Sequence, residues 1–116
     1  MRKPFKKNID QIAVEHAHGG SGSRKLILSE ADDVSSQFSA MTKGFLASGG
    51  VFDWHHHENI DEFFWVLQGS GLISFRGLDS MEYGVGDLIY IPANLEHKIE
   101  ATGDQESQYY FIRLNQ

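Results

Sequence analysis

The sequence contains no cysteine, and this absence limits the chemistry that the chain can support. Disulfides, thiol catalysis and Cys-ligated zinc are excluded, so histidine and the carboxylates remain as the only strong metal ligands. Long hydrophobic runs are also missing, and no run approaches the length needed to span a bilayer. The first eleven residues are basic and polar, without the hydrophobic region of a signal peptide. We therefore expect a cytoplasmic protein with no membrane partner.

Positive charge is scarce as well. The formal net charge of −6 argues against a nucleic-acid partner, which normally requires a basic face. Only two prolines stand against twelve glycines, which favours many tight turns. With 116 residues, 41% of them hydrophobic, the chain has the size and apolar content of one folded domain.

Apolar residues group into short strands, and no segment has a helical period long enough to predict a helix. Strands are predicted at 24–28, 37–46, 63–67, 72–75, 88–91, 97–101 and 108–114. Residues 68–71 are predicted to form a hairpin turn, and residues 76–83 to continue through a loop. Short strands separated by frequent turn signals predict an all-β sandwich or barrel.

Three consecutive histidines stand beside several carboxylates and a strongly apolar run. His55 and His57 are two residues apart, so on a strand both side chains point to one face and His56 points to the other. Two imidazoles at this spacing can converge on one metal ion. Glu62 lies an odd number of residues beyond His57, and a turn within 58–61 would let it open the next antiparallel strand beside the two histidines.

The spacing around these residues resembles the two sequence motifs of the cupin superfamily. Intervals of five, one, four and six residues separate Gly49, His55, His57, Glu62 and Gly69, which is similar to the first motif. After a further sixteen residues, intervals of five, one and two separate Gly86, Pro92, Asn94 and His97, which is similar to the second. Two positions depart from the family pattern, because Asn94 replaces a glycine and Ala101 replaces an asparagine. Neither is a ligand position.

The resemblance implies a double-stranded β-helix, or jelly-roll, barrel with a metal ion inside it. Residues 37–116 would form the barrel, and residues 1–36 an N-terminal arm and leading strands that pack on the barrel or on a partner subunit. Carried over position by position, the family pattern implies that His55, His57, Glu62 and His97 bind a divalent metal (Fe, Mn, Ni, Zn or Cu), with coordination positions left open. Such a site supports dioxygenase, decarboxylase, isomerase or lyase chemistry on a small organic substrate. Glu62 could also exchange between ligation and proton transfer.

Two other functions are compatible with the same motifs. One is a small-molecule binding or sensor protein that does not turn its ligand over, and the other is an ancillary barrel with a structural metal. Residue type alone suggests five side chains as candidates to touch a substrate, and a cation among them would favour an anion. They are Lys43, Trp54, Tyr90, Phe111 and Arg113.

The remaining expectations concern the surface. Alternation from Glu62 directs Phe64 and Val66 inward and an apolar row that includes Trp65 outward, and we expect this row to pack against another subunit or the N-terminal arm. Because cupins commonly dimerise through such a sheet, the resemblance implies a homodimer. His16 and His18 lie on a glycine-rich loop and are expected to be solvated.

Overall fold

The structure is a computed structural model that describes residues 2–17 and 19–116. Two short 3-10 helices, η1 (Ile9–Gln11) and η2 (Glu30–Asp32), accompany a fold made almost entirely of strands. The strands are β1 (Glu15–His16), β2 (Ser23–Ser29), β3 (Phe38–Leu46), β4 (Val51–His55), β5 (Ile60–Gln68), β6 (Gly71–Phe75), β7 (Leu78–Tyr83), β8 (Leu88–Ile91), β9 (His97–Ala101) and β10 (Ser107–Asn115). The predicted all-β class is confirmed.

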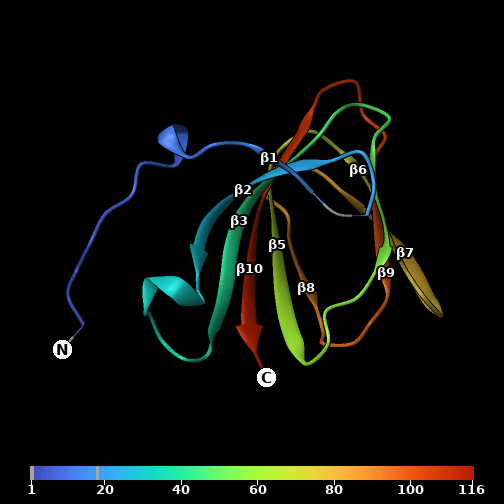
Figure 1. The fold of residues 1–116 in the computed structure, drawn as a ribbon. Coiled ribbons are helices and arrows are strands. Elements are labelled where there is room, and N and C mark those ends of the chain that lie inside the picture. The colour runs from blue at the N-terminus through green and yellow to red at the C-terminus, as the bar shows by residue number, and fades with distance from the viewer. Residues whose placement is uncertain (1, 18) are drawn as a thin grey trace.

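The strands form two antiparallel sheets that face each other (Figure 1). One sheet has the order β1-β2-β3-β10-β5-β8, and the other has the order β4-β9-β6-β7. From β3 to β6, and again from β7 to β10, every connection crosses from one sheet to the other. This is the predicted jelly-roll barrel, and the segment that precedes β1 extends away from it in Figure 1.

Three local predictions were wrong. Residues 68–71 are not a hairpin turn but a crossing between sheets, and the turn before Glu62 also crosses, so that β5 does not pair with β4. Residues 78–83 form the edge strand β7, which pairs with β6. Strand pairing depends on contacts distant in sequence, and an edge strand with few buried side chains has little apolar pattern to reveal it.

The barrel interior is filled by aromatic and branched side chains. Phe64 and Val66 of β5 are almost fully buried, whereas Trp65 is 45% exposed on the outer face, as the alternation predicts. Tyr109 and Phe111 of β10 point inward beside Phe64, with ring centroids 4.7 and 5.3 Å from its own.

The N-terminal segment takes part in the barrel. Strand β2 pairs with β3, and the loop that follows β1 is fastened to β4 of the opposite sheet. The amide of Asp53 donates to the carbonyl of Gly19 over 2.6 Å, and that of Ser21 to the carbonyl of Val51 over 2.9 Å. A Cβ at Gly20 would collide with the same Val51 carbonyl, so only glycine allows this approach. The loop therefore bridges the two sheets at the rim of the barrel.

No helix in residues 2–17 or 19–116 is long and apolar enough to cross a membrane.

Candidate metal centre

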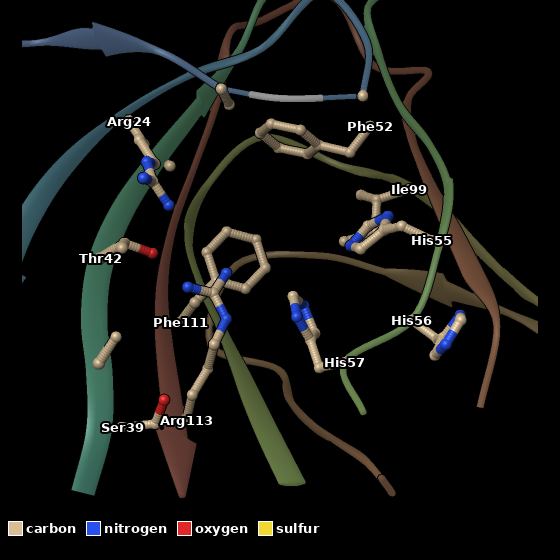
Figure 2. A pocket seen from close by; sticks show the side chains of 14 residues that line it. Arg24, Ser39, Thr42, Phe52, His55, His56, His57, Ile99, Phe111 and Arg113 are labelled. Atoms are coloured by element: carbon tan, nitrogen blue, oxygen red, sulfur yellow. The ribbon is translucent and has the colours of Figure 1, made fainter. Parts of the chain in front are cut away.

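Three histidines meet inside the barrel because of strand pairing in the smaller sheet. His55 ends β4 and His97 begins β9, and the two residues are cross-strand partners. His57 lies two residues past His55 in the turn that leads to β5, and its side chain faces the same cavity (Figure 2). One ring nitrogen from each of the three lies within 4.8 Å of the others. Neutral imidazoles in such a group could hold one metal ion.

Backbone carbonyls orient two of the three rings. Nδ1 of His55 lies 2.6 Å from the carbonyl oxygen of Asp53, and Nδ1 of His97 lies 2.9 Å from that of Leu95. Because a carbonyl only accepts, these contacts place the proton on Nδ1 of each ring. Nε2 of both rings is then left with its lone pair, which is the arrangement that metal-binding histidines generally have.

Glu62 reaches the histidines from the opposite sheet. It is fully buried, and its carboxylate oxygens lie 3.2 Å from Nε2 of His57 and 3.5 Å from Nε2 of His97. Arg113, its cross-strand partner on β10, donates from Nε to Oε2 over 2.6 Å. Burial alone would raise the pKa of Glu62, but the contacts with His57 and His97 and the charge of Arg113 outweigh it and hold the pKa well below its ordinary value. Glu62 is therefore a buried carboxylate.

Several polar atoms at this point have no hydrogen-bond partner among the described residues. They are Nε2 of His57, Nε2 of His97 and Oε1 of Glu62, and all three are buried. An unsatisfied buried polar group costs about 1–3 kcal/mol, so three together call for an explanation. Burial also lowers the pKa of His55, although its contact with the Asp53 carbonyl acts the other way, which favours the neutral ring. Imidazole nitrogens and one carboxylate oxygen fit the donor preferences of a divalent transition metal.

A cavity of about 450 Å³ lies beside this cluster. Figure 2 shows His55 and His57 on one side of it and Arg24, Thr42 and Arg113 on the other, whereas the ring of His56 is directed away. The lining residues are Ala17, Gly19, Arg24, Ser39, Ala40, Thr42, Gly44, Phe52, His55, His56, His57, Ile99, Phe111 and Arg113.

Two of the five suggested substrate residues, Phe111 and Arg113, line this cavity. The other three lie elsewhere. Lys43 packs over Phe45 on the outer face of β3, with its Nζ 5.5 Å from the ring centroid. The ring of Trp54 is covered by the guanidinium of Arg76 at 4.0 Å. The hydroxyl of Tyr90 is hydrogen-bonded to Asp61 over 3.1 Å, and this tyrosine is 51% exposed.

Sequence reasoning missed Arg24 and Thr42. Strand parity could have found Thr42, because Leu46 is buried at the end of β3 and even-numbered residues of that strand share its inward face. The same parity directs Lys43 outward. No local signal identifies Arg24, since its position depends on the pairing of β2 with β3. His16 is exposed on β1, and His18 lies outside the described residues.

Asn94, where the motif departs from glycine, fastens the turn that carries His57. It has a positive φ of 70°, a conformation that asparagine tolerates better than most residues. Its amide donates to the carbonyl of His57 over 3.1 Å, and its Oδ1 accepts from the amide of Asn59 over 2.9 Å. The side chain thus supplies a contact that glycine could not make.

Comparison with known proteins is consistent with this geometry. Residues 45–113 match a family model described as the cupin domain. Over 49 residues the chain is 39% identical to the uncharacterized protein YdbB of Bacillus subtilis, a match that covers 42% of this chain and 43% of that protein. Over 50 residues it is 40% identical to the uncharacterized protein MJ1618 of Methanocaldococcus jannaschii, covering 43% and 39%. The chain thus spans less than half the length of these curated relatives.

Solved structures share the whole fold at low sequence identity. A predicted oxalate decarboxylase from Thermotoga maritima superimposes with a TM-score of 0.84 at 21% identity, over 97% of this chain and 100% of that one. The polyketide cyclase RemF from Streptomyces resistomycificus gives 0.82 at 17% identity, over 97% and 80%. At these identities the likeness concerns the fold.

Proposed function

The chain belongs to the cupin domain family, and we propose that it binds one divalent metal ion through His55, His57, His97 and Glu62. The observation that carries the proposal is the set of buried, unpartnered atoms on His57, His97 and Glu62, which point at one another across the barrel. A metal bound by the two Nε2 atoms and Oε1 would satisfy all three.

The charges of these four ligands are compatible with a metal site that has open coordination positions. Three neutral imidazoles and one carboxylate leave a divalent ion with one positive charge, and coordination positions remain for water or substrate. Arg113 engages only Oε2 of Glu62, which leaves Oε1 for the metal. When bound, the metal supplies Lewis-acid or redox chemistry to a small molecule in the cavity. Glu62, which we propose as the catalytic carboxylate, would exchange between binding the metal through Oε1 and carrying a proton at that atom.

The substrate we propose is a small organic molecule, because the cavity of about 450 Å³ falls in the range of small-ligand sites. Phe111 would contact its apolar part and Arg113 an anionic group. The reaction belongs to the dioxygenase, decarboxylase, isomerase or lyase classes. The names of the structural neighbours, a predicted oxalate decarboxylase and a polyketide cyclase, support a small-molecule enzyme.

A second candidate function is ligand binding without turnover. Besides the histidines, the described residues that line the cavity offer arginines, hydroxyls and apolar groups, and none is a carboxylate or an amine that could serve as a general base. Such a lining suits a sensor cupin, or a barrel in which the metal has a structural role.

Metal analysis of untagged protein tests the proposal directly. We expect close to one equivalent of Fe, Mn, Ni, Zn or Cu per chain, and a rise in the unfolding temperature when metal-free protein is given its ion. His57→Ala should lose most of the bound metal, whereas the matched variant His56→Ala should retain it, because the His56 ring is directed away from the cluster. Equal losses, or wild-type protein that holds less than about 0.2 equivalents, would refute this ligand set.

Turnover separates the two candidate functions. Metal-loaded protein that transforms small carboxylates, diketones or sugar acids, followed through O₂ consumption and product formation, is an enzyme. Tight binding of such a compound without any product would favour the sensor.

A further inference from the structure

Two of the four arginines in the chain point into the cavity from the wall opposite the histidines (Figure 2). Arg24 comes from β2 and Arg113 from β10, and the strand β3 lies between them in the sheet. The chain as a whole is acidic, with a net charge of −6, yet no described residue that lines the cavity is acidic. The cavity wall therefore presents two guanidinium groups in a chain whose net charge is negative.

Each of these guanidinium groups is held at Nε. Nε of Arg24 donates to Glu15 over 2.9 Å, and Nε of Arg113 donates to Glu62 over 2.6 Å. A guanidinium has five N–H donors, so a contact through Nε fixes its orientation and leaves the terminal amino groups for another acceptor. The side chain of Arg113 is only 15% exposed and that of Arg24 is 33% exposed, so both guanidinium groups are partly shielded from water.

We propose that Arg24 and Arg113 form a binding site for the carboxylate group of a small organic acid. Carboxylates match the planar fork of arginine, and charge-assisted hydrogen bonds of this kind are about twice as strong as neutral ones. The hydroxyl of Thr42, on the same wall, is directed into the same space and can donate a further hydrogen bond (Figure 2). The ligand would then lie between this wall and the histidine cluster.

The inference rests on the proposed function, because it assigns the substrate class of the same site. Within that site, Glu15 and Glu62 each neutralise one arginine, and a divalent metal on the histidines would make the local charge positive again. Arg24 also lies outside residues 45–113, the part that matches the cupin domain. It would therefore be a specificity residue contributed by the segment that precedes the matched residues.

The test compares succinate with succinamide, which has a similar shape and no charge. Titrations are followed by calorimetry and by NMR of the arginine Nε–Hε groups, with metal-loaded and with metal-free protein. We expect succinate to bind at least about tenfold more tightly than succinamide, and to shift the resonances of Arg24 and Arg113 in both forms. Arg24→Gln should weaken succinate binding about tenfold, and Arg24→Lys should restore part of it.

The matched control is Lys43→Gln, which removes one positive charge from the outer face of the neighbouring strand β3 and should leave succinate affinity unchanged. The substitutions are made at Arg24 and not at Arg113, because replacing Arg113 would leave the buried Glu62 without its partner and could unfold the protein. Equal affinity for succinate and succinamide, or an Arg24→Gln variant that binds succinate like the wild type, overturns the inference.

These results separate the inference from the proposed function. Protein that holds metal but does not distinguish succinate from succinamide retains the proposed function and loses the carboxylate site. Protein that holds no metal but whose Arg24 and Arg113 resonances respond to succinate retains the carboxylate site and loses the metal centre.

Discussion

At the scale of single residues, the proposed centre depends on how each ligand is kept in its working protonation state. Burial lowers the pKa of His55, and the carbonyl of Asp53 fixes which of its nitrogens carries the proton. Burial alone would favour the neutral acid at Glu62, but its contacts with His57 and His97 and the charge of Arg113 lower its pKa and keep it ionised. A metal ion would thus meet one deprotonated carboxylate and a neutral imidazole already oriented.

These shifts predict loss of stability and of metal affinity in acid. The folded protein keeps His55 neutral at a pH where the unfolded chain, with an ordinary histidine pKa of about 6.5, takes up a proton. The contribution of His55 to stability is therefore present above about pH 6.5 and is lost as pH falls through the lower pKa of the folded state. Metal affinity should fall over the range below about pH 6, because protons compete for the ligand nitrogens.

Urea unfolding of metal-free protein between pH 8 and 5 measures the loss of stability. Chelator competition over the same pH range measures the loss of metal affinity. His55→Gln should show a shallower loss of stability in acid than the wild type, and His56→Gln should follow the wild type. Metal affinity that stays constant from pH 8 to 5 would contradict three imidazole ligands.

At the scale of secondary-structure elements, the site depends on two turns that support each other. The turn after β4 carries His57, and the turn before β9 carries Asn94, whose backbone and side chain hold the first turn in place. Because β4 and β9 also pair at His55 and His97, the three histidines are fixed by one pair of neighbouring strands. Glu62 alone arrives from the other sheet.

Asn94→Gly tests this arrangement. Glycine accepts the positive φ of 70° but removes the Oδ1 that binds the Asn59 amide, so His57 should be held less firmly. We expect metal affinity to fall about tenfold, which is in the range seen when a residue that orients a metal ligand is lost. Chelator competition measures the affinity.

Two other substitutions at this position serve as controls. Asn94→Asp retains a side-chain acceptor and should remain close to the wild type. Asn94→Ala should add a loss of about 1 kcal/mol in unfolding free energy, because alanine resists the left-handed conformation. Wild-type metal affinity in Asn94→Gly would show that this side chain does not position His57.

At the scale of the whole molecule, the outer face of the six-stranded sheet exposes several large apolar side chains to water at β5 and β8. Trp65 on β5 is 45% exposed, and Leu88 and Tyr90 on the edge strand β8 are 64% and 51% exposed. The three residues belong to neighbouring strands of the six-stranded sheet. A contiguous patch of this kind is typical of a subunit interface, and we propose that two chains associate through it.

Sedimentation of the wild-type protein should give a particle of twice the chain mass of 13.1 kDa. Leu88→Lys should shift the equilibrium toward the monomer, because it would bury an unpaired charge in the interface. Met81→Lys is the matched control, since Met81 is 51% exposed but lies on β7 of the other sheet. A wild-type monomer at micromolar concentration, or dissociation caused equally by both substitutions, would contradict this interface.

The sequence by itself determined the properties that depend on local pattern. Short apolar runs predict most of the strands, and alternation predicts the inward faces of Phe64 and Val66. The spacing of His55 and His57 predicts that they face one cavity, although His57 lies beyond the end of β4. The spacing of the two motifs predicts the family, which the match over residues 45–113 confirms. These signals depend on residues that are close in the sequence, so they can be recognised before it is known which strands pair.

Only the tertiary structure decided which strands meet. The sequence predicted Glu62 beside the histidines in one sheet, but it faces them from the other sheet, where β10 supplies Arg113. The pairing of β2 with β3 brings Arg24 to the cavity from outside the motifs. Strand partners are chosen by packing between residues far apart in the chain, so no local period encodes them.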